Sequence, residues 1–169
     1  MTTPVYGATH AQAPARAHGG RGHATASNIG IAGSLLALIG SFLPWIEVTA
    51  GGQSVDKLKG MDGDGVITLV AAIAAIVLFG VGVAMRKAVI SACGAVPALV
   101  IVVMGIMNMT DTERLPTQKL EDEGIPSESI KEGLTGLDMS TMFGLYVLLI
   151  GAVIAVVAGA LAFVKGRSR

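Results

Sequence analysis

Residues 66–109 of the chain determine its class of fold and read VITLVAAIAAIVLFGVGVAMRKAVISACGAVPALVIVVMGIMNM. They form two apolar runs, 66–85 and 88–109, which are separated only by Arg86 and Lys87. At a rise of about 1.5 Å per residue, runs of roughly 20 residues match a hydrocarbon core about 30 Å thick. The stretch therefore predicts two membrane-spanning helices joined by a short basic link.

Two further apolar runs, 29–46 and 143–164, have similar lengths and contain no Asp, Glu, Lys or Arg. The whole chain is 52% hydrophobic and only 14% charged, whereas soluble domains carry about 25% charged residues. This composition argues against a soluble enzyme, a disordered chain and a nucleic-acid-binding protein. We expect an all-α membrane protein, a bundle of four transmembrane helices that forms one domain over residues 29–164.

The charges predict the orientation of this bundle. The first 28 residues, the 86–87 link and the tail 165–169 together hold seven basic residues and no acidic one. The loops 47–65 and 110–142 hold the other five basic residues and all 12 acidic ones. Because basic residues concentrate in cytoplasmic segments, we expect a cell-membrane protein with two outer loops and both termini in the cytoplasm. Residues 1–28 are predicted to be a disordered cytoplasmic tail, and 165–169 a basic one.

A signal peptide is the alternative for the first apolar run, because Arg16 and Arg21 precede it and Val48 to Ala50 are small enough for a cleavage site. The run has 18 residues, which exceeds the usual signal core of about 7 to 15. We therefore expect the first helix to be retained.

The outer loops contain signals of local structure. The alternating residues 47–54 lead to Gly51 and Gly52, which favours a short β-hairpin. Residues 126–133 are typical of a short helix. The segment 62–67 resembles the middle of a calcium loop, but the positions of both essential carboxylates are then occupied by Gly60 and Ala71.

Acidic side chains are instead expected to cap helices, either Asp62 or Asp64 for the second span and Asp138, with Ser140, for the fourth. Asp62 and Asp64 precede the second span, and Asp138 precedes the fourth. A carboxylate at such a position accepts hydrogen bonds from the free amides of the first helical turn. Trp45, beside Pro44 at the end of the first span, is predicted to be an anchor at the membrane interface.

Small residues recur at every fourth position on two of the predicted helices. Such stripes let helix backbones approach closely. In lipid, where the hydrophobic effect does not drive helices together, this close packing drives their association. We expect them to mediate helix packing inside the bundle; the alternative is a face that meets another protein or a second copy of the chain. The residues are Gly33, Ala37, Ser41, Gly151, Ala155 and Gly159.

Function is constrained mainly by what the spans lack. They contain no His, Asp, Glu or Lys, so the single cysteine, Cys93, has no base within its span and a proton relay is absent. We expect no catalytic residue, no cofactor and no metal. The chain is interpreted as a scaffold or interaction partner in a cell-envelope membrane complex; the alternative is a transport component or an oligomeric pore. Its expected partners are the lipid bilayer and another membrane protein or itself, and not nucleic acid.

Three short motifs resemble those of a set of uncharacterised small bacterial four-helix (tetraspan) integral membrane proteins. They are the sequence FLPW at residues 42–45, the segment Gly60 to Gly65, and the segment Gly136 to Tyr146. The resemblance covers residues 29–164. It implies the four-helix membrane architecture and carries no biochemical activity.

Overall fold

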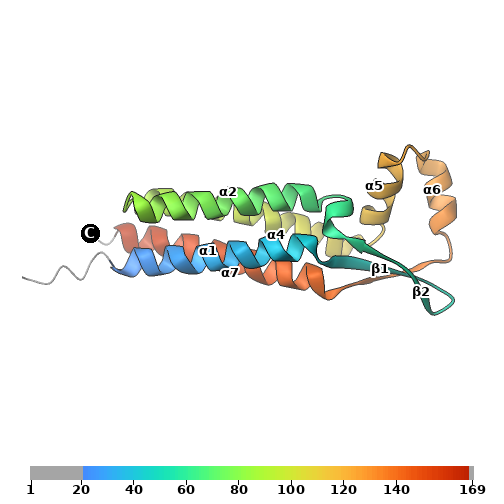
Figure 1. The fold of residues 1–169 in the computed structure, drawn as a ribbon, viewed down its shortest axis with the longest axis horizontal. Helices are drawn as coiled ribbons and strands as arrows, with labels where there is room; N and C mark the ends of the chain where they lie inside the picture. Colours follow the sequence, from blue (N-terminus) through green and yellow to red (C-terminus); the bar gives the residue numbers. More distant parts are fainter. Residues whose placement is uncertain (1–20, 168–169) are drawn as a thin grey trace, which may run out of the picture.

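The fold is a bundle of four long helical segments with a small extra layer at one end (Figure 1). The computed structural model describes residues 21–167. The bundle helices are α1 (Arg21–Phe42), α2 (Gly65–Ala84), α3 (Ala88–Cys93) with α4 (Ala95–Thr110), and α7 (Phe143–Arg167).

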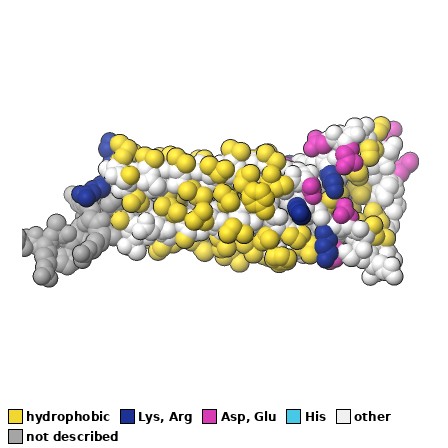
Figure 2. Space-filling view, in the orientation of Figure 1, with side chains coloured by type: hydrophobic (Ala, Val, Ile, Leu, Met, Phe, Trp, Pro, Cys, Tyr) yellow, Lys and Arg dark blue, Asp and Glu magenta, His cyan; other side chains and the backbone are white. Residues whose placement is uncertain are grey.

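The four segments are long and apolar enough to cross a membrane: Ala24–Phe42, Gly65–Ala84, Ala88–Thr110 and Phe143–Arg167. On the face shown in Figure 2, hydrophobic side chains spread over the bundle, and charged side chains gather at its two ends. Large apolar residues on the surface of the bundle, such as Val70 and Val96, are 62% and 66% exposed. Such exposure is favourable in the hydrocarbon core of a membrane. The predicted four-helix membrane bundle is confirmed.

The first helix differs from its predicted range of 29–46. It begins by Arg21, so residues 21–28, which were expected to belong to a disordered tail, are helical; residues 1–20 lie outside the described part of the chain. The helix ends at Phe42 because the chain turns into a strand at Pro44, and proline cannot supply the amide that a helix needs. The sequence did not predict the first two turns of α1, because residues 21–28 are mostly small or polar and do not form an apolar run.

The third span is interrupted at Gly94, between α3 and α4. Pro97 has no amide to donate to the carbonyl of Cys93, and its ring crowds that carbonyl, which breaks the regular helix at this point. Gly94 also lies against the ring of Phe79: a β-carbon at Gly94 would be 2.9 Å from it.

The layer at the end of the bundle is called the head, and it comprises residues 44–62 and 111–141. It contains a three-stranded antiparallel sheet in the order β2-β1-β3 and two short helices that pack beside it (Figure 1). Its elements are β1 (Pro44–Ala50), β2 (Gln53–Lys59), the short helix η2 (Gly60–Asp62), α5 (Arg114–Asp122), α6 (Ser127–Leu134) and β3 (Asp138–Thr141).

The first outer loop is the predicted hairpin. Its turn residues, Gly51 and Gly52, have φ angles of +58° and +80°. Glycine adopts these positive angles without strain, and they suit the twist of a two-residue hairpin turn. The third strand, β3, was not predicted; it pairs with β1 along the edge opposite β2.

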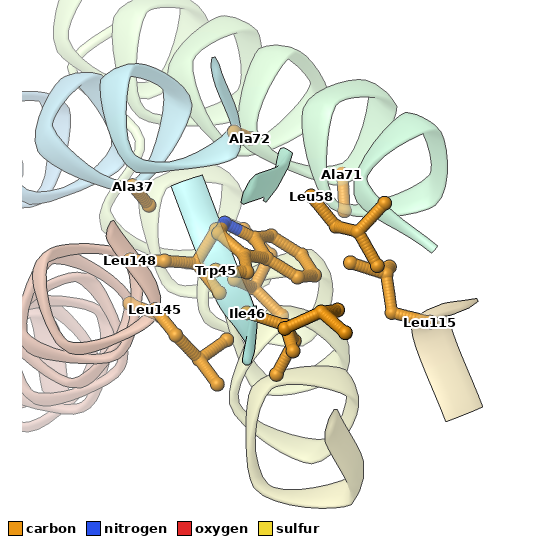
Figure 3. Close-up of a cluster of buried hydrophobic side chains, with 12 residues drawn as sticks. Ala37, Trp45, Ile46, Leu58, Ala71, Ala72, Leu115, Leu145 and Leu148 are labelled. Carbon is orange, nitrogen blue, oxygen red and sulfur yellow. The ribbon is translucent and has the colours of Figure 1, made fainter. Parts of the chain in front are cut away.

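Trp45 lies at the centre of the junction between the head and the bundle (Figure 3). A bulge at Trp45 shifts the register of β1 against β2, so that Trp45 and Ile46, although consecutive, are both fully buried. The indole Nε1 donates a hydrogen bond of 2.9 Å to the carbonyl of Gly40. The prediction of an interface anchor is therefore wrong, because the ring is enclosed by protein.

The small residues on α1 and α7 lie where these two helices pack side by side. A β-carbon at Gly151 would be 2.6 Å from the carbonyl oxygen of Gly33 and 2.5 Å from the amide nitrogen of Ala37. A β-carbon at Gly33 would likewise come within 2.9 Å of the nitrogen of Ala155. Contact this close is possible only where side chains are small.

The two remaining stripe residues contact the other spans. The hydroxyl groups of Ser41 and Thr68 share a hydrogen bond of 3.0 Å between α1 and α2. Gly159 packs against Ala95 on α4: a β-carbon added at Gly159 would lie 2.6 Å from the β-carbon of Ala95. All six stripe residues thus face neighbouring helices inside the bundle.

Candidate binding site in the head

A buried carboxylate holds the head on the mouth of the bundle. Asp64 immediately precedes α2, and its side chain is only 6% exposed. Its Oδ2 accepts hydrogen bonds from Arg114 Nε at 2.8 Å and from Asn108 Nδ2 at 3.0 Å. Its Oδ1 accepts one from Gln118 Nε2 at 3.0 Å. Asn108 comes from the last turn of α4, whereas Arg114 and Gln118 lie one turn apart on α5, so a single carboxylate ties together three elements.

None of the three carboxylates caps the span that it was expected to cap. Asp64 occupies the capping position of α2, but its side chain makes no capping bond, because the polar groups of α4 and α5 take both of its oxygens. Asp62 accepts a hydrogen bond of 2.8 Å from the amide of Lys59 and so closes the short helix η2. Asp138 lies in β3, where its carbonyl accepts a bond of 3.1 Å from Thr49 Oγ1.

The surroundings of Asp64 keep it ionised. Burial by itself raises the pKa of this carboxyl, but hydrogen bonds from Arg114, Asn108 and Gln118 and the positive charge of Arg114 favour the charged form more strongly. The pKa is lowered as a net result. Asp64 is therefore a permanent anion at neutral pH, suited to holding α5 in place and unsuited to donating a proton.

A groove opens between the hairpin and the two head helices once α5 is fixed in this way. Its volume is about 290 Å³. Five apolar residues line it: Val48, Leu58, Pro116, Leu120 and Leu134. Three charged residues complete the lining, namely Asp56 on β2, Lys119 on α5 and Glu123 directly after α5.

The charged residues of the groove form one loose ion pair. Lys119 Nζ lies 3.6 Å from Asp56 Oδ2, and the two side chains are 33% and 57% exposed. An exposed pair at this distance contributes less than about 1 kcal/mol, so a ligand can compete with it. A groove with an apolar floor and a few charged groups is the usual form of a small-molecule site.

The described part of the chain has no candidate metal site. Among residues 21–167, no three side chains of His, Cys, Asp or Glu come together in a way that could hold a metal ion. Cys93, the lone thiol, is exposed on the outside of α3.

Sequence reasoning missed the partners of Asp64 and the groove, although part of the signal was present. Arg114 and Gln118 are spaced four residues apart, which places them on one face of a helix. Nothing in the sequence indicates that Asp64 and Gln118, 54 positions apart, lie within hydrogen-bond distance. Only the packing of α5 on the bundle brings them together.

Comparison with known proteins adds one relationship. No curated protein and no solved structure matches the chain. The family of tryptophan-associated transmembrane proteins matches residues 28–169, a range that includes the head and nearly all of the bundle. Because this match covers most of the sequence, the chain belongs to the family of tryptophan-associated transmembrane proteins.

Proposed function

We propose that this protein is a non-enzymatic interaction protein of the cell membrane, whose bundle anchors the head and whose head contacts another membrane protein or a second copy of the chain. In this proposal both termini lie in the cytoplasm and the head lies outside. The head carries most of the polar surface that a partner could recognise.

The distribution of charge is the main support for the proposal. Residues 24–42, 65–84, 88–110 and 143–164 contain no Asp, Glu, Lys, Arg or His. Two buried hydroxyls of the spans, those of Ser34 and Ser41, donate to carbonyl groups of their own helix, at 2.8 and 3.2 Å, whereas the buried hydroxyl of Ser91 has no hydrogen-bond partner among the described residues. A transporter retains costly polar groups along its pathway, and the spans offer few, so the head is the better candidate for the working part.

Site-specific photo-crosslinking tests the proposal. A crosslinker at Val55, which is 64% exposed on β2, is expected to capture a discrete protein partner in intact cells. Val77, 54% exposed in the middle of α2, is the matched control and should crosslink to lipid. The proposal fails if no head position yields a protein adduct and if purified protein in liposomes produces solute flux above that of empty vesicles. Because the family is described as tryptophan-associated, L-tryptophan belongs among the solutes offered.

Orientation is tested by cysteine labelling in a Cys93→Ala background. We expect Ser54→Cys, at the tip of the hairpin, to react with a membrane-impermeant reagent in intact cells. Lys87→Cys, in the link between the second and third spans, should react only after the membrane is permeabilised. The opposite pattern would place the head in the cytoplasm.

A further inference from the structure

We propose that the groove of the head binds a free α-amino acid with a large apolar side chain. Both the shape and the charges of the groove support this ligand class, which goes beyond an interaction function. The inference can fail while the interaction function stands, since the crosslinking test does not depend on a small ligand.

Size restricts the ligand to a small molecule. Small-molecule sites have volumes of about 300 to 1,000 Å³, and the groove, at about 290 Å³, lies at the lower limit. This space suits a single amino acid and not a larger metabolite or a folded segment of protein. Its position between β2 and α5 leaves one side open to solvent for entry.

The floor of the groove selects an apolar side chain. Leu58 and Pro116, which are buried, and Leu120 and Leu134, which are half-buried, give the groove its apolar lining. Each buried methylene of a ligand gains about 0.8 kcal/mol by leaving water. Glycine, which has no side chain to place there, gains none of this energy.

The rim of the groove carries the charges that a zwitterion needs. Lys119 on α5 and Glu123, the residue that follows α5, both line the groove, and Asp56 lines it from β2, where it pairs with Lys119. The ammonium group of the ligand takes the place of Lys119 beside Asp56 and is also attracted by Glu123. The ligand carboxylate pairs with the released Lys119. A ligand with only a negative charge would meet two carboxylates and one ammonium group, and would be repelled.

Binding is measured on the full-length protein in nanodiscs with radiolabelled L-phenylalanine, with unlabelled L-tryptophan and L-leucine as competitors. We expect saturable binding. Three analogues test the recognised groups separately: glycine lacks the apolar side chain, 3-phenylpropionate lacks the ammonium group, and L-phenylalaninamide lacks the carboxylate. Each should compete at least about tenfold more weakly, which corresponds to about 1.4 kcal/mol. If the amide competes as well as phenylalanine does, the site recognises an amino group alone and the proposal is wrong.

Conservative variants of the rim test the assignment of residues. Glu123→Gln and Lys119→Gln should each weaken phenylalanine binding about tenfold or more. Glu128→Gln and Lys131→Gln make the same changes on α6, at exposed positions that do not line the groove, and should bind as the wild type does. Unchanged emission of Trp45 verifies that each variant is folded. The proposal is overturned by the absence of saturable binding, by 3-phenylpropionate competing as well as phenylalanine, or by rim variants that bind normally.

Discussion

Asp64 shows how one side chain can determine the position of a whole element. It lies at the boundary between membrane and head, and its two oxygens receive three donors from α4 and α5. Burying a carboxylate is costly unless its hydrogen bonds are satisfied and its charge is paired. Here both conditions are met, so removal of the charge affects the partners as much as Asp64 itself.

Asp64→Asn is expected to loosen α5 while the spans remain folded. The substitution leaves Arg114, whose side chain is only 30% exposed, without its counter-charge, and it replaces one acceptor oxygen with an NH2 donor that faces the donors of α4 and α5. We expect a loss of about 2 kcal/mol, measured as faster hydrogen exchange or proteolysis in residues 114–122. Asp56→Asn removes a carboxylate from an exposed ion pair and should cost less than about 1 kcal/mol. Equal effects of the two variants would contradict a special role for Asp64.

The contribution of Asp64 should depend on pH in a defined direction. Because folding lowers its pKa, the stabilisation is present above the unfolded value of about 3.9 and is lost as the pH falls through the lower folded value. The stability difference between the wild type and Asp64→Asn should therefore be constant from about pH 5 to 8 and decrease below about pH 4. Denaturant titrations at several pH values measure it, and a difference that already decreases near pH 6 would show that the pKa is raised.

Trp45 is the only tryptophan of the chain and so reports on its own burial. Because the ring is fully enclosed, we expect blue-shifted fluorescence that is protected from both aqueous acrylamide and brominated lipids. Strong quenching by brominated lipids would show that the Trp45 ring contacts lipid at the membrane interface and is not enclosed by protein. Trp45→Ala should destabilise the protein by about 3 to 5 kcal/mol.

At the scale of elements, α1 and α7 form the most extensive helix contact of the bundle. Gly151→Leu should separate these helices, because the added side chain would meet backbone atoms of Gly33 and Ala37 that cannot move aside. Overpacking of this kind costs about 1 to 3 kcal/mol. Gly80→Leu is the control, since a β-carbon there meets nothing within 4 Å. Thermal unfolding in detergent compares the two, and equal melting temperatures would contradict the close contact.

The elements differ in how far the sequence predicts them. The spans follow from composition, because lipid imposes a long apolar run on any helix that crosses it. The hairpin follows from Gly51 and Gly52, which carry a local signal. Strand β3 and the contact between Asp64 and Gln118 depend on residues far away in the chain, so no local pattern indicates them. Trp45 was misplaced for the same reason: beside a span it resembles an interface residue, and only the bulge in β1 reveals that it is buried.

At the scale of the whole molecule, the bundle and the head are held together by different forces. In the bundle, breaking a backbone hydrogen bond would expose unsatisfied polar groups to lipid, which costs several kcal/mol for each group. The head depends on a small apolar core and on the contacts of Asp64 in water. We therefore expect urea to change the emission of Trp45 at a lower concentration than it reduces the helical signal in far-ultraviolet circular dichroism. Coincident transitions would indicate that head and bundle unfold as one unit.

The pairing of β3 with β1 has a consequence for biosynthesis. Strand β1 follows the first span and β3 precedes the last one, with Ile46 opposite Thr141. A ribosome must therefore add more than 90 residues after β1, including two further spans, before the free edge of that strand finds its partner. An open strand edge invites pairing with other chains. During this interval the nascent protein exposes a strand edge that the finished molecule conceals. The exposure ends when β3, which directly precedes the last span, is made and pairs with β1.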